Sequence, residues 1–165
     1  MPNIQGILKM ENNPKLFTMN QIRPWLYIGK YRETLDLELL NNYGINAMLQ
    51  LAELVRQPEI ICLYLAVEDG ISLPPEMLKT GIEFIKSNQS EGRRVLVACG
   101  AGISRSAAFA IAALKEIEQL TLIEAYTEIK LSHPETLPHP AIWQSLCGYY
   151  LEEVPYSDML RAGKA

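Results

Sequence analysis

The 165-residue chain lacks the features that mark several classes of protein. Its net charge of -4 gives no basic surface of the kind that nucleic-acid-binding domains use, so we expect no nucleic-acid partner. No apolar run approaches the length of a membrane span, and the opening MPNIQGILKMENNPK lacks the apolar stretch of a signal peptide. We therefore expect a cytoplasmic protein that does not contact a membrane.

Cysteine and histidine are scarce. The three cysteines, Cys62, Cys99 and Cys147, are odd in number and widely spaced, unlike the cysteines of a disulfide framework. This pattern fits a protein of a reducing compartment, where a cysteine can act as a thiolate. His133 and His139 are the only histidines, and no cluster of cysteines or carboxylates accompanies them. That pattern lacks the ligand spacing of a metal site, so we expect neither a metal nor another cofactor.

Short apolar runs that suit buried strands recur along the chain. They lie on either side of Pro24 within Phe17–Gly29, and over Ile45–Ala52, Ile60–Val67 and Arg94–Cys99. Between and after them come five stretches of helical pattern. These are Arg32–Tyr43, a helix that begins at Pro75 and ends near EGRR, and Ile103–Leu120, Thr121–Leu131 and Ala141–Glu153.

This alternation predicts an α/β fold with a mostly parallel central sheet flanked by helices on both faces. Thr121 and Glu124 have the spacing of a capping box at the start of one helix. No repeat, linker or low-complexity segment divides the chain. We expect a single domain over residues 1–165, with its core at about residues 17–153.

The stretch VLVACGAGISRSAAF, residues 95–109, carries the chemistry. Cys99 ends an apolar strand, and ligands of parallel α/β sheets bind at that edge. Two glycines in the loop Gly100-Ala101-Gly102-Ile103-Ser104 allow successive N–H groups to point inward and bind an anion. Arg105 begins the next helix and offers a planar fork that suits two phosphate oxygens.

The same surroundings act on the cysteine. Thiols beside a helix N-terminus and an arginine ionise at lower pH than free thiols, so we expect Cys99 to be a nucleophilic thiolate near neutral pH. Ser106 is positioned to donate a hydrogen bond to the sulfur and assist its departure. An arginine six positions after a cysteine is a weak signal alone, but the strand, the glycines and Ser106 around it make a strong one.

VLVACGAGISRSAAF resembles the signature loop of the cysteine-dependent protein tyrosine phosphatases, in the dual-specificity branch. WLYIG, YGINAMLQLA, LAVEDG and PHPAIWQSL resemble further family landmarks in the expected order, from Trp25 to Glu152. The resemblance implies that Cys99 is the nucleophile, Arg105 the phosphate ligand and Asp69 the general acid. Glu68 is the neighbour that could be confused with that acid.

Two positions depart from the family pattern. The family usually has a histidine immediately before the cysteine, where this chain has Ala98, so we expect weaker activation of Cys99. His139 stands where the family commonly has an asparagine that braces the loop. Its imidazole is a candidate substitute for that support, and an exposed turn residue is the alternative.

We therefore predict a monomeric phosphomonoester hydrolase that forms a phosphocysteine and acts on phosphotyrosine, with or without phosphoserine and phosphothreonine, in a phosphorylated protein or peptide. A catalytically weak phosphate-binding protein is one alternative, favoured by Ala98. A phosphoinositide or small-molecule phosphatase is another, although the loop has no lysine. A rhodanese-type sulfurtransferase is a third, although Ser106 and Asp69 argue against it.

The other cysteines and the tryptophans have simpler readings. Cys62 and Cys147 are expected in the core, with a resolving thiol for oxidised Cys99 as the alternative role of Cys62. Trp25 and Trp143 are expected to be packing residues.

Overall fold

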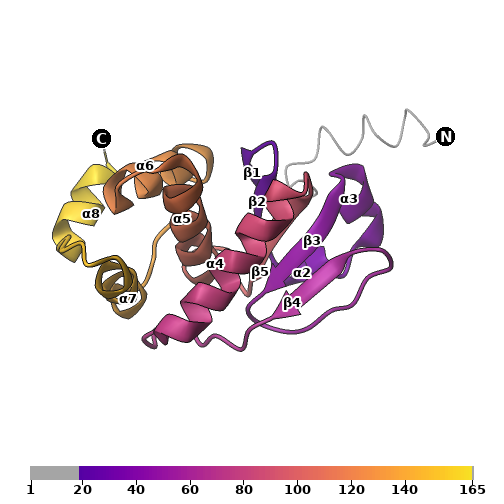
Figure 1. Cartoon of the computed structure of the whole chain (residues 1–165), viewed down its shortest axis with the longest axis horizontal. Coiled ribbons are helices and arrows are strands. Elements are labelled where there is room, and N and C mark those ends of the chain that lie inside the picture. Colours follow the sequence, from indigo (N-terminus) through magenta and orange to yellow (C-terminus); the bar gives the residue numbers. More distant parts are fainter. Residues whose placement is uncertain (1–18, 165) are drawn as a thin grey trace.

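A five-stranded mixed sheet forms the centre of the computed structural model, which describes residues 19–164 (Figure 1). The strands are β1 (Asn20–Arg23), β2 (Leu26–Lys30), β3 (Ile45–Gln50), β4 (Ile61–Tyr64) and β5 (Arg94–Cys99). They are arranged in the order β1-β2-β5-β3-β4, and only the β1–β2 pair is antiparallel. The predicted mostly parallel sheet is confirmed.

Helices cover both faces of this sheet. They are α2 (Tyr31–Thr34), α3 (Leu37–Asn42), α4 (Pro75–Ser90), α5 (Arg105–Glu118), α6 (Leu122–Ser132), α7 (Pro140–Tyr150) and α8 (Tyr156–Ala162). The short helices α2 and α3 pack on one face, and α4 and α5 pack on the other. Helices α6, α7 and α8 gather around α5 at one end of the molecule (Figure 1). None of the helices in residues 19–164 is long and apolar enough to cross a membrane.

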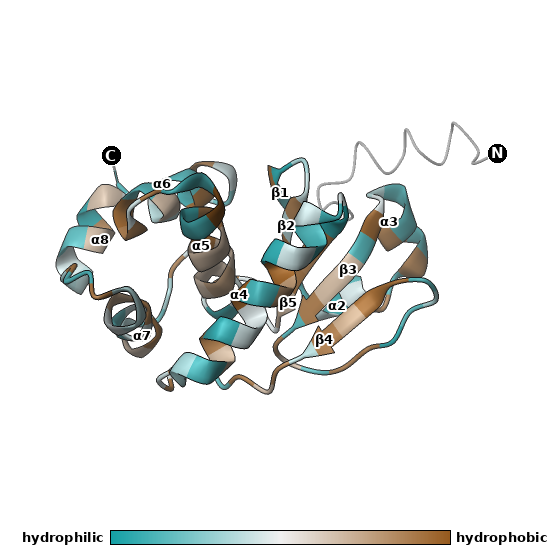
Figure 2. Cartoon of the chain, viewed as in Figure 1, coloured by the Kyte–Doolittle hydropathy of each residue, from teal (hydrophilic) through white to brown (hydrophobic). Residues whose placement is uncertain are grey.

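Strand β5 lies in the middle of the sheet and divides the core into two clusters. Because side chains alternate along a strand, Val95, Val97 and Cys99 join the larger cluster under α4 and α5. Leu96 and Ala98 join the smaller cluster beneath α3. The strands are among the most hydrophobic segments, while α4 turns hydrophilic residues to solvent (Figure 2). The two residues before the loop, Ala98 and Cys99, therefore face opposite sides of the sheet.

The predicted helix over Arg32–Tyr43 is wrong as a single element, because the structure has two helices there. The side chain of Asp36 accepts a hydrogen bond from the Leu39 amide at 3.0 Å and caps α3. An aspartate that binds a nearby amide in this way begins a new helix and does not continue the previous one.

The predicted buried strand Ile60–Val67 is also wrong in extent and burial. Strand β4 covers only Ile61–Tyr64 at the edge of the sheet, and its two end residues are exposed. Edge position decides this exposure, since a strand at the edge has a neighbour on one side only. The predicted helix start at Pro75 and the Thr121–Glu124 capping box are confirmed.

The sequence did not reveal α8. Its Met159 is fully buried in the larger cluster, so the core extends beyond residue 153. The Tyr156 hydroxyl donates to the Pro138 carbonyl at 2.7 Å and fixes the start of α8 beside the turn before α7. The part of the predicted first strand at Phe17 lies outside the described residues.

Candidate active site

Cys99 ends β5, the middle strand, and only 2% of its surface is exposed. The Gly102 amide donates to Cys99 Sγ at 3.2 Å, and Ser106 Oγ lies 3.2 Å from the same sulfur. Ser106 is fully buried in the first turn of α5. Both groups can donate hydrogen bonds to a thiolate, and the short separation agrees with the predicted closeness of Cys99 and Ser106.

The outer side of the loop is held by the segment between α6 and α7. His133 Nε2 lies 2.6 Å from the Gly102 carbonyl oxygen, and the Leu137 amide donates to the Ile103 carbonyl at 3.0 Å. A trans peptide points its C=O and the following N–H in opposite directions. These two bonds therefore turn the amides of Ile103 and Ser104 away from the supporting segment, which is the arrangement an anion needs.

Gly102 is required by the shape of this loop. Its φ of 69° lies in the left-handed region, and a Cβ there would come within 3.0 Å of the Gly29 carbonyl oxygen on β2. Gly100 serves a different purpose, since a Cβ at that position would lie 2.9 Å from Arg105 Nη2. The glycine lets the guanidinium lie close to the loop.

Arg105 connects two loops: the predicted phosphate-binding loop, residues 99–105 (the phosphate loop), and the loop that carries the predicted acid, Asp69. Its Nη1 donates to the Val67 carbonyl at 2.8 Å, and Val67 directly precedes Glu68 and Asp69. The side chain thus lies at the boundary between two cavities, whose walls both include Arg105 and Asp69.

A cavity of about 300 Å³ brings most of the predicted site residues together, but Gly100, Gly102 and Ser106 do not line it. Its walls include Cys99, Ala101, Ile103, Ser104, Arg105, Asp69, His139, Leu137, Pro138, Pro140 and Tyr156. Asp69 lines this cavity, whereas Glu68 lines only the neighbouring one. The geometry therefore favours Asp69 over Glu68 as the residue that approaches a substrate above Cys99.

His139 supports the loop through its main chain. Its amide donates to Ser104 Oγ at 2.9 Å, while its Nδ1 accepts from the Ala141 amide and caps α7. The other edge of the ring faces Gly70, where a Cβ would lie 3.5 Å from Nε2. The imidazole itself is directed at the acid loop and at α7, which differs from the expectation that it would brace the phosphate loop.

Sequence reasoning missed three contributors to the site. His133, which was considered only as a metal ligand, is 4% exposed and holds the Gly102 carbonyl. Val67 supplies the acceptor for Arg105, and Tyr156 reaches the cavity from α8. No local pattern could have identified them, because each acts across a long separation in sequence.

The remaining cysteines lie apart from this site. Burial raises the pKa of the Cys62 and Cys147 thiols, which keeps both protonated at neutral pH. Cys62 packs against the smaller cluster, on the sheet face opposite Cys99, so it cannot act as a resolving thiol without rearrangement. Trp143 is buried and Trp25 is partly buried against the larger cluster, as expected of packing residues. Within residues 19–164, no group of three or more potential ligands could hold a metal ion.

Comparison with known proteins identifies the family. The model for "Dual specificity phosphatase, catalytic domain" matches residues 26–152. The chain belongs to the dual specificity phosphatase family. This match includes Cys99, Arg105, Asp69 and His139, but it ends before Tyr156.

Two curated members of the family illustrate the degree of similarity. Dual specificity protein phosphatase 16 of Homo sapiens is 34% identical over 126 residues, which are 72% of this chain and 19% of that protein. Dual specificity protein phosphatase 19 of Mus musculus is 31% identical over 136 residues, which are 78% of this chain and 60% of that protein. The chain thus spans about a fifth and three fifths of these two phosphatases.

Similar solved structures share the fold. The crystal structure of DUSP15 has a TM-score of 0.75 and 25% identity, with 89% of this chain and 95% of that chain covered. The human tyrosine phosphatase-like serine/threonine/tyrosine-interacting protein has a TM-score of 0.74 and 26% identity, with 81% and 96% covered. The predicted dual-specificity phosphatase-like fold is confirmed.

Proposed function

We propose that this protein hydrolyses phosphomonoesters, with phosphotyrosine in proteins or peptides as its main substrate, through a phosphocysteine intermediate. The observation that supports it is the convergence of Cys99, Arg105 and Asp69 on one cavity of about 300 Å³. These three residues have the chemistry of a nucleophile, an anion ligand and a proton donor. Phosphoserine and phosphothreonine are secondary substrates of the same chemistry.

The reaction begins with the phosphoryl group bound by the inward amides of the loop and by Arg105. The Cys99 thiolate attacks phosphorus, the bond from phosphorus to the leaving oxygen breaks, and Asp69 gives its proton to that oxygen. The carboxylate then takes a proton from a water molecule, whose oxygen attacks the phosphocysteine. The S–P bond breaks, inorganic phosphate forms, and Ser106 donates a hydrogen bond to the departing sulfur.

The walls of the cavity favour an aryl phosphate. Much of the wall beside the loop is apolar and comes from Leu137, Pro138, Ile103 and Tyr156. A phosphotyrosine ring can bury its faces against such walls, whereas the short side chain of phosphoserine cannot reach them. Burial also raises the pKa of the Tyr156 phenol, so this hydroxyl stays protonated and keeps its hydrogen bond to Pro138.

The decisive experiment measures hydrolysis of p-nitrophenyl phosphate and of phosphotyrosyl, phosphoseryl and phosphothreonyl peptides, with rapid quenching to trap a phosphocysteine. The wild type should turn over the aryl substrates fastest. Cys99→Ser should abolish turnover, by at least about 10⁴-fold, and should still bind vanadate. A wild type that releases no phosphate from any of these substrates contradicts the proposal.

A second candidate is a phosphate reader with little turnover. Ala98 supports this candidate, because the family usually has a histidine at that position. One of the similar solved structures also carries the description of a tyrosine phosphatase-like interacting protein. The two candidates differ in one measurement. A reader binds phosphotyrosyl peptides through Arg105 but accumulates no phosphocysteine, even when Asp69→Ala slows the second step.

We further propose that the protein acts as a monomer in the cytoplasm and without a bound cofactor. A thiolate nucleophile needs a reducing compartment to stay active, and the three described cysteines are all free.

A further inference from the structure

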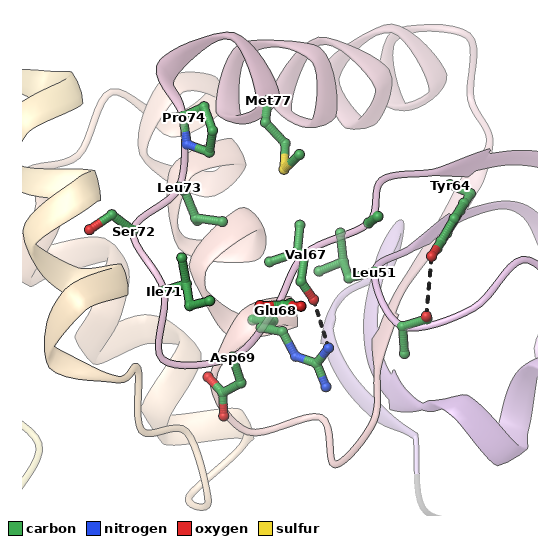
Figure 3. Close-up of a pocket in the computed structure, with 13 residues that line it drawn as sticks. Leu51, Tyr64, Val67, Glu68, Asp69, Ile71, Ser72, Leu73, Pro74 and Met77 are labelled. Carbon is green, nitrogen blue, oxygen red and sulfur yellow. Dashed lines mark hydrogen bonds between the residues drawn. The ribbon is translucent and has the colours of Figure 1, made fainter.

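Figure 3 shows a second, larger cavity, of about 670 Å³. It shares Asp69 and Arg105 with the catalytic cavity, and its apolar side chains take no part in the proposed reaction. It lies between the start of α4, the segment after β3 and the loop after β4. Its apolar lining includes Leu51, Tyr64, Val67, Ile71, Leu73 and Met77.

The cavity has an ordered floor and an exposed apolar rim. Leu51, Val67 and Leu73 are buried and belong to the larger core cluster. At the rim, Ile71 is 53% exposed and Tyr64 is 39% exposed. Large apolar side chains at this degree of exposure, gathered around one hollow, are typical of a surface that binds an apolar group.

Two residues connect this cavity to the catalytic one. Asp69 and Arg105 line both, so the two cavities share a wall. Consecutive residues of an extended peptide advance by about 3.3 Å, so residues one or two positions from a phosphorylated residue stay close to it. A peptide whose phosphorylated residue occupies the first cavity can therefore place a neighbouring side chain in the second.

The charge of the rim further restricts which side chains the cavity can hold. Glu68 lines this cavity together with Asp69, and Arg105, the only basic residue among the described residues of its lining, already donates to the Val67 carbonyl. An acidic side chain placed here would meet like charge, and a lysine would lose its hydration against the apolar lining, whereas an apolar side chain suffers neither penalty.

We propose that this cavity is a substrate subsite that holds a large apolar side chain one or two positions from the phosphorylated residue of a peptide. This inference rests on the proposed phosphatase function and names the class of peptide that the site prefers. It assigns to Met77 and Ile71 a role in specificity and none in the chemical steps.

The test compares kcat/KM for short phosphotyrosyl peptides that carry Leu, Lys or Asp singly at each of the two positions on either side of the phosphotyrosine. The wild type should prefer Leu at one of these positions by about tenfold over both Lys and Asp, since a buried leucine contributes strongly to binding. Met77→Glu puts a negative charge into the cavity, which disfavours Leu and attracts Lys, so the preference for Leu over Lys should fall to less than about threefold.

Ser87→Glu is the matched control, because it adds the same charge to an exposed position of α4 outside the cavity. It should keep the wild-type preference. p-Nitrophenyl phosphate has no flanking residue, so its turnover should be the same in the wild type and in both variants.

The outcomes separate the subsite from the function. Turnover of p-nitrophenyl phosphate without a leucine preference, or a preference that survives Met77→Glu, overturns the subsite and leaves the phosphatase standing. No turnover of any substrate overturns both. A dimer that forms with rising concentration and is dispersed by Met77→Glu assigns the cavity to a second copy and also overturns the subsite.

Discussion

The two loops that meet at the candidate active site are built in opposite ways. The phosphate loop, residues 99–105, is held by His133, Leu137 and His139. The acid loop, residues 68–70, exposes the side chains of Glu68 and Asp69, and the hydrogen bonds that anchor it lie at its two ends. Before the loop, Val67 is bonded to Leu51 and Arg105, and after it the Leu73 amide donates to Ser145 Oγ at 2.9 Å.

This difference separates two tasks. The sulfur and the amides must be in place before the substrate arrives, because an anion site gains its strength from dipoles that need no rearrangement. In the proposed reaction Asp69 must approach the leaving oxygen of the substrate, and a loop anchored at both ends allows that. Changes to Arg105 or to the support of the loop amides should therefore affect binding and chemistry together, whereas changes to Asp69 should affect chemistry alone.

Arg105→Ala should have the largest effect, because Arg105 takes part in both loops. Loss of the phosphate fork and of the bond to Val67 should lower kcat/KM for p-nitrophenyl phosphate by about 10³–10⁵-fold and abolish vanadate binding. Arg105→Lys should recover little, since an ammonium cannot make the paired bonds. Tight vanadate binding by Arg105→Ala would show that the amides alone hold the anion.

Asp69→Asn should slow chemistry and leave binding intact. Substrates with poor leaving groups should lose about 10²–10⁴-fold in kcat, while activated aryl phosphates should lose much less, because a good leaving group needs no proton. The measurement is a series of aryl phosphates of graded leaving-group basicity. Glu68→Gln is the control and should leave the series unchanged, and equal slowing across the series by Asp69→Asn would contradict its role as the acid.

His133→Leu tests the support beneath the phosphate loop. Leaving the buried Gly102 carbonyl without its partner should weaken vanadate binding and lower kcat/KM by about tenfold. His133→Gln can still present a donor near the Nε2 position and should restore most of the loss. Thermal melting of both variants separates support of the loop from general stability. If both variants lose the same activity and keep the wild-type melting temperature, the proposed role of His133 in holding the Gly102 carbonyl is wrong.

Tyr156→Ala tests the wall that α8 contributes. We expect KM for phosphotyrosyl peptides to rise about fivefold, from the loss of aromatic contact, with little change for phosphoseryl peptides. Tyr156→Phe keeps the ring and should retain most of the affinity. A rise in KM that is the same for both kinds of peptide would show that α8 does not select the aryl group.

Ala98→His should give the smallest change. We expect the pH midpoint for alkylation of Cys99 by iodoacetamide to fall by up to about one unit, because the added histidine supports the loop and the thiolate. Cys62 and Cys147 serve as internal references: burial raises the pKa of these thiols, so they react only at higher pH. Ala98→Leu controls for crowding in the smaller cluster, and an unchanged midpoint in Ala98→His would contradict our account of this position.

The sequence alone determined the alternation of strands and helices, except for the break at Asp36 and for α8, and the residue types of the loop between β5 and α5. These features could be predicted because alternating apolar runs, helix caps and the cysteine-to-arginine spacing are local patterns that extend over only a few residues. The same locality explains its errors. At Asp36 the local sequence allows either a continuing helix or a new helix capped by the aspartate, and the structure has the second. The exposure of β4 depends on its place at the sheet edge, which no local pattern shows.

Only the tertiary structure decided which distant residues complete the site. His133, Val67 and Tyr156 come from three separate segments, and their contacts with Gly102, Arg105 and Pro138 join residues 31, 38 and 18 positions apart. Such contacts arise where the ends of packed elements meet, and no nearby residue encodes them. The proposed nucleophile and phosphate ligand therefore lie in one continuous stretch of sequence, whereas the approach of Asp69, the support of the loop and the specificity depend on the packing of the whole fold.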